Sequence, residues 1–173
     1  LIWFEYVLDT SRLAKKEGLK NVLVTNGYIN PKPFEELLPY IDAMNIDLKS
    51  IRDEFYRVLC NGRLKPVQTT IERAKRACHI ELTNLLVTNR NDARGDIKDL
   101  IDWVASLGRD TILHFSRYFP QYKLDEPATP IEVLMQAYEF AKDKLDYVYL
   151  GNILGEEGGN TYCPRCKALL IHR

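Results

Sequence analysis

The stretch Asn45-Ile46-Asp47-Leu48-Lys49 alternates polar and apolar residues. In an extended segment successive side chains point to opposite faces, so Asn45, Asp47 and Lys49 share one face and Ile46 and Leu48 share the other. A strand covered by helices on both sides should be apolar on both faces. Three polar groups in one row cost desolvation free energy unless they bind each other, water or a ligand. The stretch therefore predicts a strand that leads into a site.

Helix and strand signals alternate around this stretch, which is typical of a mostly parallel α/β sheet. We predict strands over 21–25, 43–47, 81–87, 111–116 and 147–150. We predict helices over 4–17, 33–39 and 53–59, from Pro66 onward, over 96–107 with Asp96 as its cap, and after Thr129-Pro130 as the cap of the last one. Five strands are too few for a closed eight-stranded barrel, so we expect an open or partial one.

Composition narrows the functional classes. The 173 residues fit one domain, and 24 basic residues balance 24 acidic ones, so net charge favours neither nucleic acid nor an anionic membrane as a partner. No apolar run approaches the ~20 residues of a membrane span and no signal peptide is recognisable, which predicts a cytoplasmic protein. Because Leu1 is not Met and the next residues already resemble an ordered element, we expect a piece of a longer protein.

Polar residues also follow the other predicted strands. Thr25-Asn26-Gly27 closes the first strand, Glu81 and Thr83 share a face of the third, and His114 and Ser116 share a face of the fourth, which Arg117 follows. Each has a structural alternative: a turn, a capping group, a packed histidine or a solvated arginine. In parallel α/β folds, however, ligands bind at the carboxyl ends of the strands, so their shared position predicts one ligand site, with Arg117 available to a carboxylate or phosphate.

The last part of the chain differs in composition. We predict a partial barrel over 1–152 and, over 153–173, a glycine-rich linker with Gly155, Gly158 and Gly159 followed by a cysteine tail. Cys163-Pro164-Arg165-Cys166 is half of a zinc-ribbon pattern, because two thiolates at this spacing can share one tetrahedral ion. Two free thiols are the alternative. Cys60 and Cys78 are expected to be packed and unreactive.

The order of these motifs resembles radical S-adenosylmethionine (SAM) enzymes of the pyruvate formate-lyase activating type. The matching segments are Thr25-Asn26-Gly27, Asn45 to Lys49, Glu54-Phe55-Tyr56 and His114 to Pro120, and Gly159 to Cys166 is similar to the C-terminal segment of the radical SAM proteins of the AmmeMemoRadiSam system. The resemblance covers nearly the whole chain. It implies a partial (β/α)₆ barrel, cleavage of SAM to a 5′-deoxyadenosyl radical, and a 4Fe–4S cluster held by a CxxxCxxC loop.

The resemblance also implies roles for single residues. Lys49 would lie near the SAM carboxylate, and Asp47 would be a polar anchor and, with Thr25, part of a monovalent cation site. The SAM-binding set it suggests is Thr25, Asn26, Asn45, Asp47, Lys49, Thr83, His114 and Arg117. A protein substrate and Memo-like or AMMECR-like partners are implied in the same way. The zinc ligands predicted from the cysteine spacing alone are Cys163 and Cys166.

One departure concerns the cluster. No CxxxCxxC occurs in the 173 residues, so we expect a C-terminal fragment that is inactive alone and whose first strand is an unpaired sheet edge. Two other functions stay open. Lys49 would be the nucleophile of a Schiff-base lyase or aldolase, with Asp47 or His114 carrying the proton, or the chain would be a non-catalytic interaction module.

Overall fold

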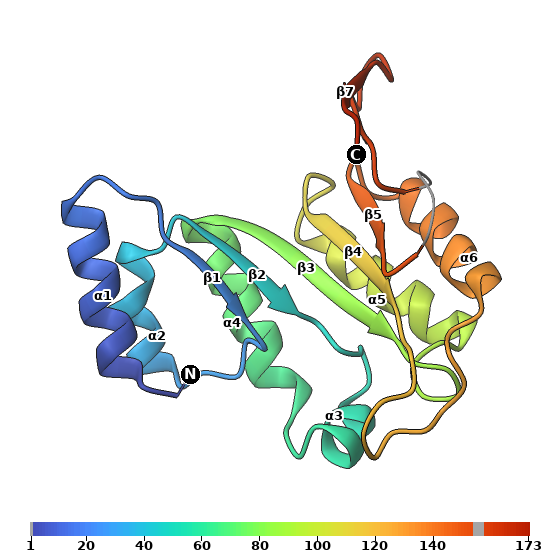
Figure 1. Cartoon of the computed structure of the whole chain (residues 1–173), viewed down its shortest axis with the longest axis horizontal. Helices are drawn as coiled ribbons and strands as arrows, with labels where there is room; N and C mark the ends of the chain where they lie inside the picture. Colours follow the sequence, from blue (N-terminus) through green and yellow to red (C-terminus); the bar gives the residue numbers. More distant parts are fainter. Residues whose placement is uncertain (1, 154–157) are drawn as a thin grey trace.

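A computed structural model describes residues 2–153 and 158–173 and contains a five-stranded parallel sheet. Its strands are β1 (Val22–Thr25), β2 (Ala43–Asp47), β3 (His79–Leu86), β4 (Ile112–Arg117) and β5 (Val148–Gly151). They neighbour one another in the order in which they occur in the sequence, and Figure 1 shows the sheet running from β1 to β5 across the molecule. The predicted α/β class and all five predicted strands are confirmed.

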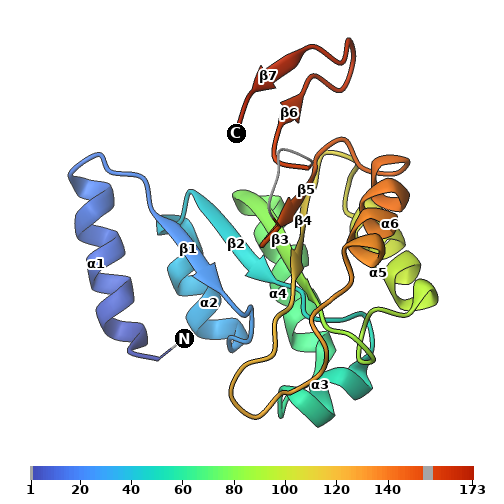
Figure 2. The same cartoon turned by 45° about the vertical axis from the view of Figure 1, so that its right-hand side comes forward.

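Helices connect the strands, and most of them lie on one side of the sheet (Figures 1 and 2). They are α1 (Phe4–Lys16), α2 (Pro31–Leu37) with a 3₁₀ turn η1 (Leu38–Tyr40), α3 (Asp53–Leu59), α4 (Leu64–Ala77), α5 (Arg94–Ser106) and α6 (Ile131–Lys142). Sequential strand order with helices on one side is the winding of a (β/α) barrel, here left open. The partial barrel predicted from the sequence is therefore confirmed.

The core lies between this face of the sheet and the helices. In β2 and just beyond it Met44, Ile46 and Leu48 are at most 1% exposed, whereas Asn45 and Asp47, on the other face, are only partly buried. Helix α4 supplies one apolar stripe, because Val67, Ile71 and Ala74 recur at helical spacing and are fully buried. The uncovered face is consequently free to carry polar side chains.

Three local predictions need correction. Helix α4 begins at Leu64, two residues before Pro66, because proline is tolerated in the first helical turn, where its missing N–H has no partner. Asp96 is not the cap of α5; it lies in the first turn and accepts a hydrogen bond from Arg52 at 2.8 Å. Of the predicted Thr129-Pro130 cap of α6, Pro130 is the N-cap residue, whereas Thr129 does not cap the helix because its hydroxyl donates to the carbonyl of Leu86 at 2.5 Å.

The C-terminal tail forms a hairpin that the sequence did not predict. Strands β6 (Thr161–Tyr162) and β7 (Leu169–Ile171) pair antiparallel and project away from the main sheet (Figures 1 and 2). Gly155 of the predicted linker lies outside the described residues, whereas the Gly158 carbonyl accepts a hydrogen bond from the N–H of Leu150 at 3.0 Å. Within the described part of the chain, none of the helices is both long and apolar enough to cross a membrane.

Candidate functional site

The uncovered face of the sheet carries a row of polar and aromatic residues. The strand register aligns Asp47 with Thr83, Thr83 with His114, and His114 with Tyr149. On the same face, two residues nearer the start of each strand, Asn45 is aligned with Glu81. The Thr83 hydroxyl donates to the Asn45 side-chain oxygen at 3.0 Å. The register therefore brings Asn45, Asp47, Thr83 and His114 onto one face, as the alternation in the sequence predicted.

Glu81 and His114 form a close pair on this face. The His114 Nε2 lies 2.7 Å from the Glu81 Oε2, and the His114 ring stacks on Tyr149 with the ring centroids 5.2 Å apart. The Tyr149 hydroxyl in turn lies 2.8 Å from the hydroxyl of Thr161 in β6. The Glu81 carboxylate at Nε2 and the stacked Tyr149 ring fix the orientation of the His114 ring. The direction in which its Nδ1 atom points is therefore fixed as well. Tyr149 lies in the strand predicted over 147–150 but is not among the predicted site residues.

Lys49 lies just beyond the end of β2 and forms an ion pair with Asp47. The Lys49 Nζ is 3.1 Å from the Asp47 Oδ2, and the two side chains are 39% and 38% exposed. Half-exposed pairs of this kind contribute little to stability, so they can be exchanged for contacts with a ligand at low cost. The pair presents a cation and an anion side by side at the carboxyl end of a central strand.

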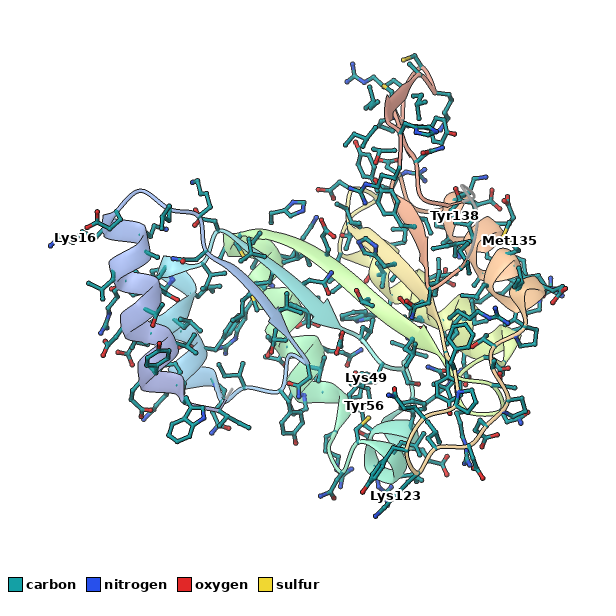
Figure 3. The ribbon with its side chains drawn as sticks, viewed as in Figure 1. Lys16, Lys49, Tyr56, Lys123, Met135 and Tyr138 are labelled. Carbon is teal, nitrogen blue, oxygen red and sulfur yellow. The ribbon has the colours of Figure 1, made fainter. Side chains whose placement is uncertain are left out.

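Three side chains hold the backbone that carries this ion pair. The Lys49 N–H donates to the Tyr56 hydroxyl at 3.0 Å, Asn84 Nδ2 donates to the Leu48 carbonyl at 2.7 Å, and Asn91 Nδ2 donates to the Lys49 carbonyl at 2.7 Å. Tyr56, Asn84 and Asn91 are at most 4% exposed, and burial raises the pKa of Tyr56 to about 12. Figure 3 shows Lys49 and Tyr56 next to each other near α3.

Sequence reasoning missed these three supporting residues. Asn84 lies 36 residues from its partner and Asn91 lies 42 residues from its own. A buried polar residue inside an apolar run, such as Asn84 between Leu82 and Leu86, was the available signal. The Asn84 Oδ1 is buried without a hydrogen-bond partner in the described structure.

The turn after β1 approaches Lys49 from the other side. Asn26, Lys49, Tyr56 and Cys60 line one pocket of about 180 Å³. The Asn26 and Thr25 side chains accept the N–H groups of Tyr28 and Gly27 at 3.0 Å and 3.2 Å. The structural alternative proposed for Thr25-Asn26-Gly27, a turn, is therefore present, and Asn26 also faces the Lys49 pocket.

Two predicted site residues do not join the row. Thr25 pairs in register with Ile46, on the helix-covered face, so it is not aligned with Asp47. Arg117 alternates with Ser116 in β4 and likewise belongs to the helix-covered face; its Nε donates to the Thr129 carbonyl at 2.8 Å. The expectation that these two side chains share one rim with Asp47 needs correction, because strand alternation directs them to the opposite face.

The cysteines lie apart from this row. Burial raises the pKa of the Cys60 and Cys78 thiols, in line with packed and unreactive groups. Cys163 and Cys166 are in the projecting hairpin. Among the residues that the structure describes, no three His, Cys, Asp or Glu side chains gather as a metal site.

Comparisons with known proteins give matches in sequence. Residues 1–104 match the family model of the radical SAM superfamily. The chain is 48% identical over 176 residues to protein MJ0808 of Methanocaldococcus jannaschii, covering 99% of this chain and 52% of MJ0808. It is 39% identical over 57 residues to the pyruvate formate-lyase 1-activating enzyme of Escherichia coli, covering 32% of this chain and 23% of that enzyme. The chain thus spans about half of the first relative and less of the second.

The fold also resembles solved structures. A domain of the pyruvate-formate lyase-activating enzyme from Bacteroides vulgatus superposes with a TM-score of 0.74 at 20% identity, over 86% of this chain and 91% of that one. SuiB from Streptococcus suis, whose structure was determined bound to SAM, gives a TM-score of 0.66 at 11% identity over 84% of this chain and 36% of that one. At these identities the likeness is one of fold.

Proposed function

This chain belongs to the radical SAM superfamily, and on that premise we propose that the uncovered face of its sheet binds SAM in an enzyme of the pyruvate formate-lyase activating type. The observation that carries the proposal is the polar row in register across β2, β3 and β4, which reaches the carboxyl end of β2 at Asp47, and ligands of such folds bind at the carboxyl ends of the strands. A helix-free face has no structural need for this row, so a ligand accounts for it better than packing does.

The Asp47–Lys49 ion pair suits the methionyl end of SAM. That end is a zwitterion, with an ammonium group and a carboxylate on one carbon. Lys49 would pair with the carboxylate and Asp47 with the ammonium group, exchanging one half-exposed ion pair for two. Asn45 and Thr83, already hydrogen-bonded to each other, would offer amide and hydroxyl groups to the rest of the molecule, and Asn26 would close the Lys49 pocket.

In this superfamily SAM supplies a 5′-deoxyadenosyl radical that abstracts hydrogen from a substrate, with electrons from a 4Fe–4S cluster. The cysteines of this chain do not fit such a cluster. Cys60 and Cys78 are partly buried thiols, Cys163 and Cys166 are a pair, and no third ligand joins them in the described residues. We therefore propose that this chain binds and orients SAM, and we assign no role in the reaction to its own cysteines.

The narrower assignment concerns partners. Gly159 to Cys166 resembles the AmmeMemoRadiSam proteins, so we propose a protein substrate and association with Memo-like or AMMECR-like proteins. Co-purification of the tagged chain with candidate partners tests this step. Failure to recover them would remove the narrower assignment and leave SAM binding in place.

Titration of the chain with SAM, monitored by calorimetry and by amide chemical shifts, tests the main proposal. We expect shifts at Asn45, Asp47 and Thr83. Lys49→Met should weaken SAM binding by about tenfold or more, the usual cost of losing a hydrogen bond to a charged group. Lys20→Met is the matched control, because Lys20 forms an equally short 3.1 Å ion pair with Asp42 at the opposite end of β2.

Other outcomes would decide against the proposal. Equal affinity of wild type and Lys49→Met, or shifts confined to other surfaces, would contradict SAM binding at this face. A borohydride-stable adduct of a carbonyl compound on Lys49 would favour the Schiff-base lyase. The structure gives that alternative little support, because the Lys49 amine is engaged by Asp47 instead of standing in an apolar pocket. If the chain neither binds SAM nor forms a carbonyl adduct on Lys49, the non-catalytic interaction module remains as the function.

A further inference from the structure

The proposed binding of SAM leaves two contacting residues of the uncovered face, Glu81 and His114, without a role. They lie to the side of the Asp47–Lys49 ion pair, because His114 is in β4, two strands from Asp47 and therefore roughly 10 Å across the sheet. Glu81 is aligned with Asn45, two residues and therefore roughly 7 Å nearer the strand starts than Asp47. The Glu81–His114 pair thus lies deeper in the open barrel than the ion pair does.

The hydrogen bond within this pair leaves one ring nitrogen of His114 open. The His114 Nε2 lies 2.7 Å from the Glu81 Oε2, and an ionised carboxylate can only accept, so the ring donates from Nε2. In the neutral ring the other nitrogen, Nδ1, is then an acceptor. Nδ1 makes no hydrogen bond to a residue of 2–153 or 158–173, and the side chain is 23% exposed. The face therefore presents an acceptor that the described chain does not fill.

The ring of His114 is held on its other side by β5 and the C-terminal hairpin. It stacks on Tyr149, with the ring centroids 5.2 Å apart and the planes inclined by 27°. The Tyr149 hydroxyl lies 2.8 Å from the Thr161 hydroxyl, and both residues are at most 9% exposed. The guanidinium carbon of Arg173, which follows β7, lies 5.6 Å from the centroid of the Tyr149 ring. The hairpin therefore contacts the sheet face through the residue that holds His114.

We propose that His114 accepts a hydrogen bond from an N–H or O–H group of the substrate at Nδ1, and that Tyr149 and the hairpin position its ring. The inference rests on the proposed function, because it takes the carboxyl end of β2 as the SAM site. A carboxylate behind an imidazole fixes the tautomer and raises the basicity of the other nitrogen, as it does for metal-binding histidines. A site with such an acceptor rejects substrates that lack the donor, because the acceptor is then left unpaired. The backbone amides of a protein substrate supply donors of this kind.

Nitrogen NMR of the histidine rings tests the acceptor. We expect the neutral His114 ring to carry its proton on Nε2, seen as a low-field N–H signal, and to leave Nδ1 unprotonated. Glu81→Ala should remove the low-field signal. Glu81→Gln should keep it, because the amide oxygen of glutamine can still accept the hydrogen bond. A proton on Nδ1 of the neutral wild-type ring would overturn the proposal.

Exchange of the His114 Nε2 proton with water tests the positioning role. Thr161→Val and Tyr149→Phe each remove the bond between the two hydroxyls and keep the side-chain shape, so each should speed exchange by about fivefold, the factor that one net hydrogen bond contributes to an opening equilibrium. Tyr162→Phe is the matched control, because it removes a 45% exposed hydroxyl-bearing side chain's polar group from the neighbouring residue and should leave the rate unchanged. Amide exchange of the main sheet should not change, as it would after a general loss of stability. Wild-type rates in Thr161→Val and Tyr149→Phe would overturn the positioning role.

Chemical modification separates this inference from SAM binding. Diethyl pyrocarbonate acylates unprotonated imidazole nitrogens, and mass spectrometry assigns the product among the three histidines, His79, His114 and His172. Saturating SAM should protect Lys49 from acetic anhydride and leave the acylation rate of His114 unchanged. Protection of both residues would make His114 a SAM contact, which overturns the inference and supports the proposed function.

Two other results are equally decisive. If His114 does not react even without SAM, Nδ1 is not an open acceptor and the inference fails, whatever happens at Lys49. If SAM protects neither residue, SAM binding at this face is contradicted, and the inference that rests on it fails as well.

Discussion

Asn91→Ala should be strongly destabilising although Asn91 touches no ligand and lies in a loop. Its side chain makes three hydrogen bonds: the Oδ1 accepts the Val87 N–H at 2.6 Å, and the Nδ2 donates to the Lys49 carbonyl at 2.7 Å and the Leu85 carbonyl at 2.9 Å. Asn91 is 4% exposed, so water does not readily replace these partners. The side chain therefore ties the end of β3 to the segment that follows β2.

The magnitude follows from counting these groups. Each intramolecular hydrogen bond contributes about 1 kcal/mol net, and a buried N–H left without a partner costs about 1–3 kcal/mol. Because the two carbonyls retain a second lone pair, we expect a total loss of about 3 kcal/mol in the free energy of unfolding. For a chain of this size, that loss corresponds to a decrease in Tm of about 6–12 °C.

Urea unfolding of wild type and variant measures the effect. Asn30→Ala is the control, because Asn30 is exposed and its side chain makes no capping bond at the start of α2, so its change should stay within about 0.5 kcal/mol. Asn91→Asp should be no milder than Asn91→Ala, since it places a carboxylate oxygen against two carbonyls. A loss below about 1 kcal/mol for Asn91→Ala would refute the reasoning, because three buried bonds cannot then be contributing to stability.

Three further outcomes follow from the same structure. Gly27→Ala should lower the free energy of unfolding by about 1–3 kcal/mol in urea titrations, because φ is +70° and the added Cβ would lie 2.8 Å from the Ile46 Cγ2; a neutral result would contradict the close approach. Above pH 10 the unfolded Tyr56 loses its proton before the folded one, whose pKa is about 12, so stability should fall by up to about 2–3 kcal/mol by pH 12. Tyr56→Phe should have a shallower alkaline loss, and equal slopes would argue against the shift. Iodoacetamide should modify Cys163, whose pKa is lowered chiefly by the backbone N–H of Cys166, before Cys60, whose pKa burial raises, as mass spectrometry of timed samples would reveal; the reverse order would contradict these two pKa shifts.

The sequence was sufficient for features that repeat over several residues. Alternation in Asn45 to Lys49 identified β2 and the polar face, and the spacing of strands and helices identified an open parallel barrel. These patterns are local, and burial of one face imposes them whatever the rest of the fold does.

Features set by distant partners were not accessible in this way. The assignment of Thr25 and Arg117 to one rim failed because parity along each strand, fixed by its register with neighbours, sends them to the helix side. Asn91 was missed because its partner Lys49 is 42 residues away. The β6–β7 hairpin was missed because strands of two and three residues are shorter than any window that reveals alternation.

Strand β1 bonds to β2 on one side only among the described residues, and Val22 and Val24 are 63% and 77% exposed. Its outer row of backbone donors and acceptors is a template that does not discriminate between chains. A parallel strand supplied in cis would extend the curvature of the barrel, whereas the same strand offered by a neighbouring molecule would start a polymer. Only the pairing between molecules depends on protein concentration, so self-association through β1 should grow as the protein is concentrated and fall on dilution.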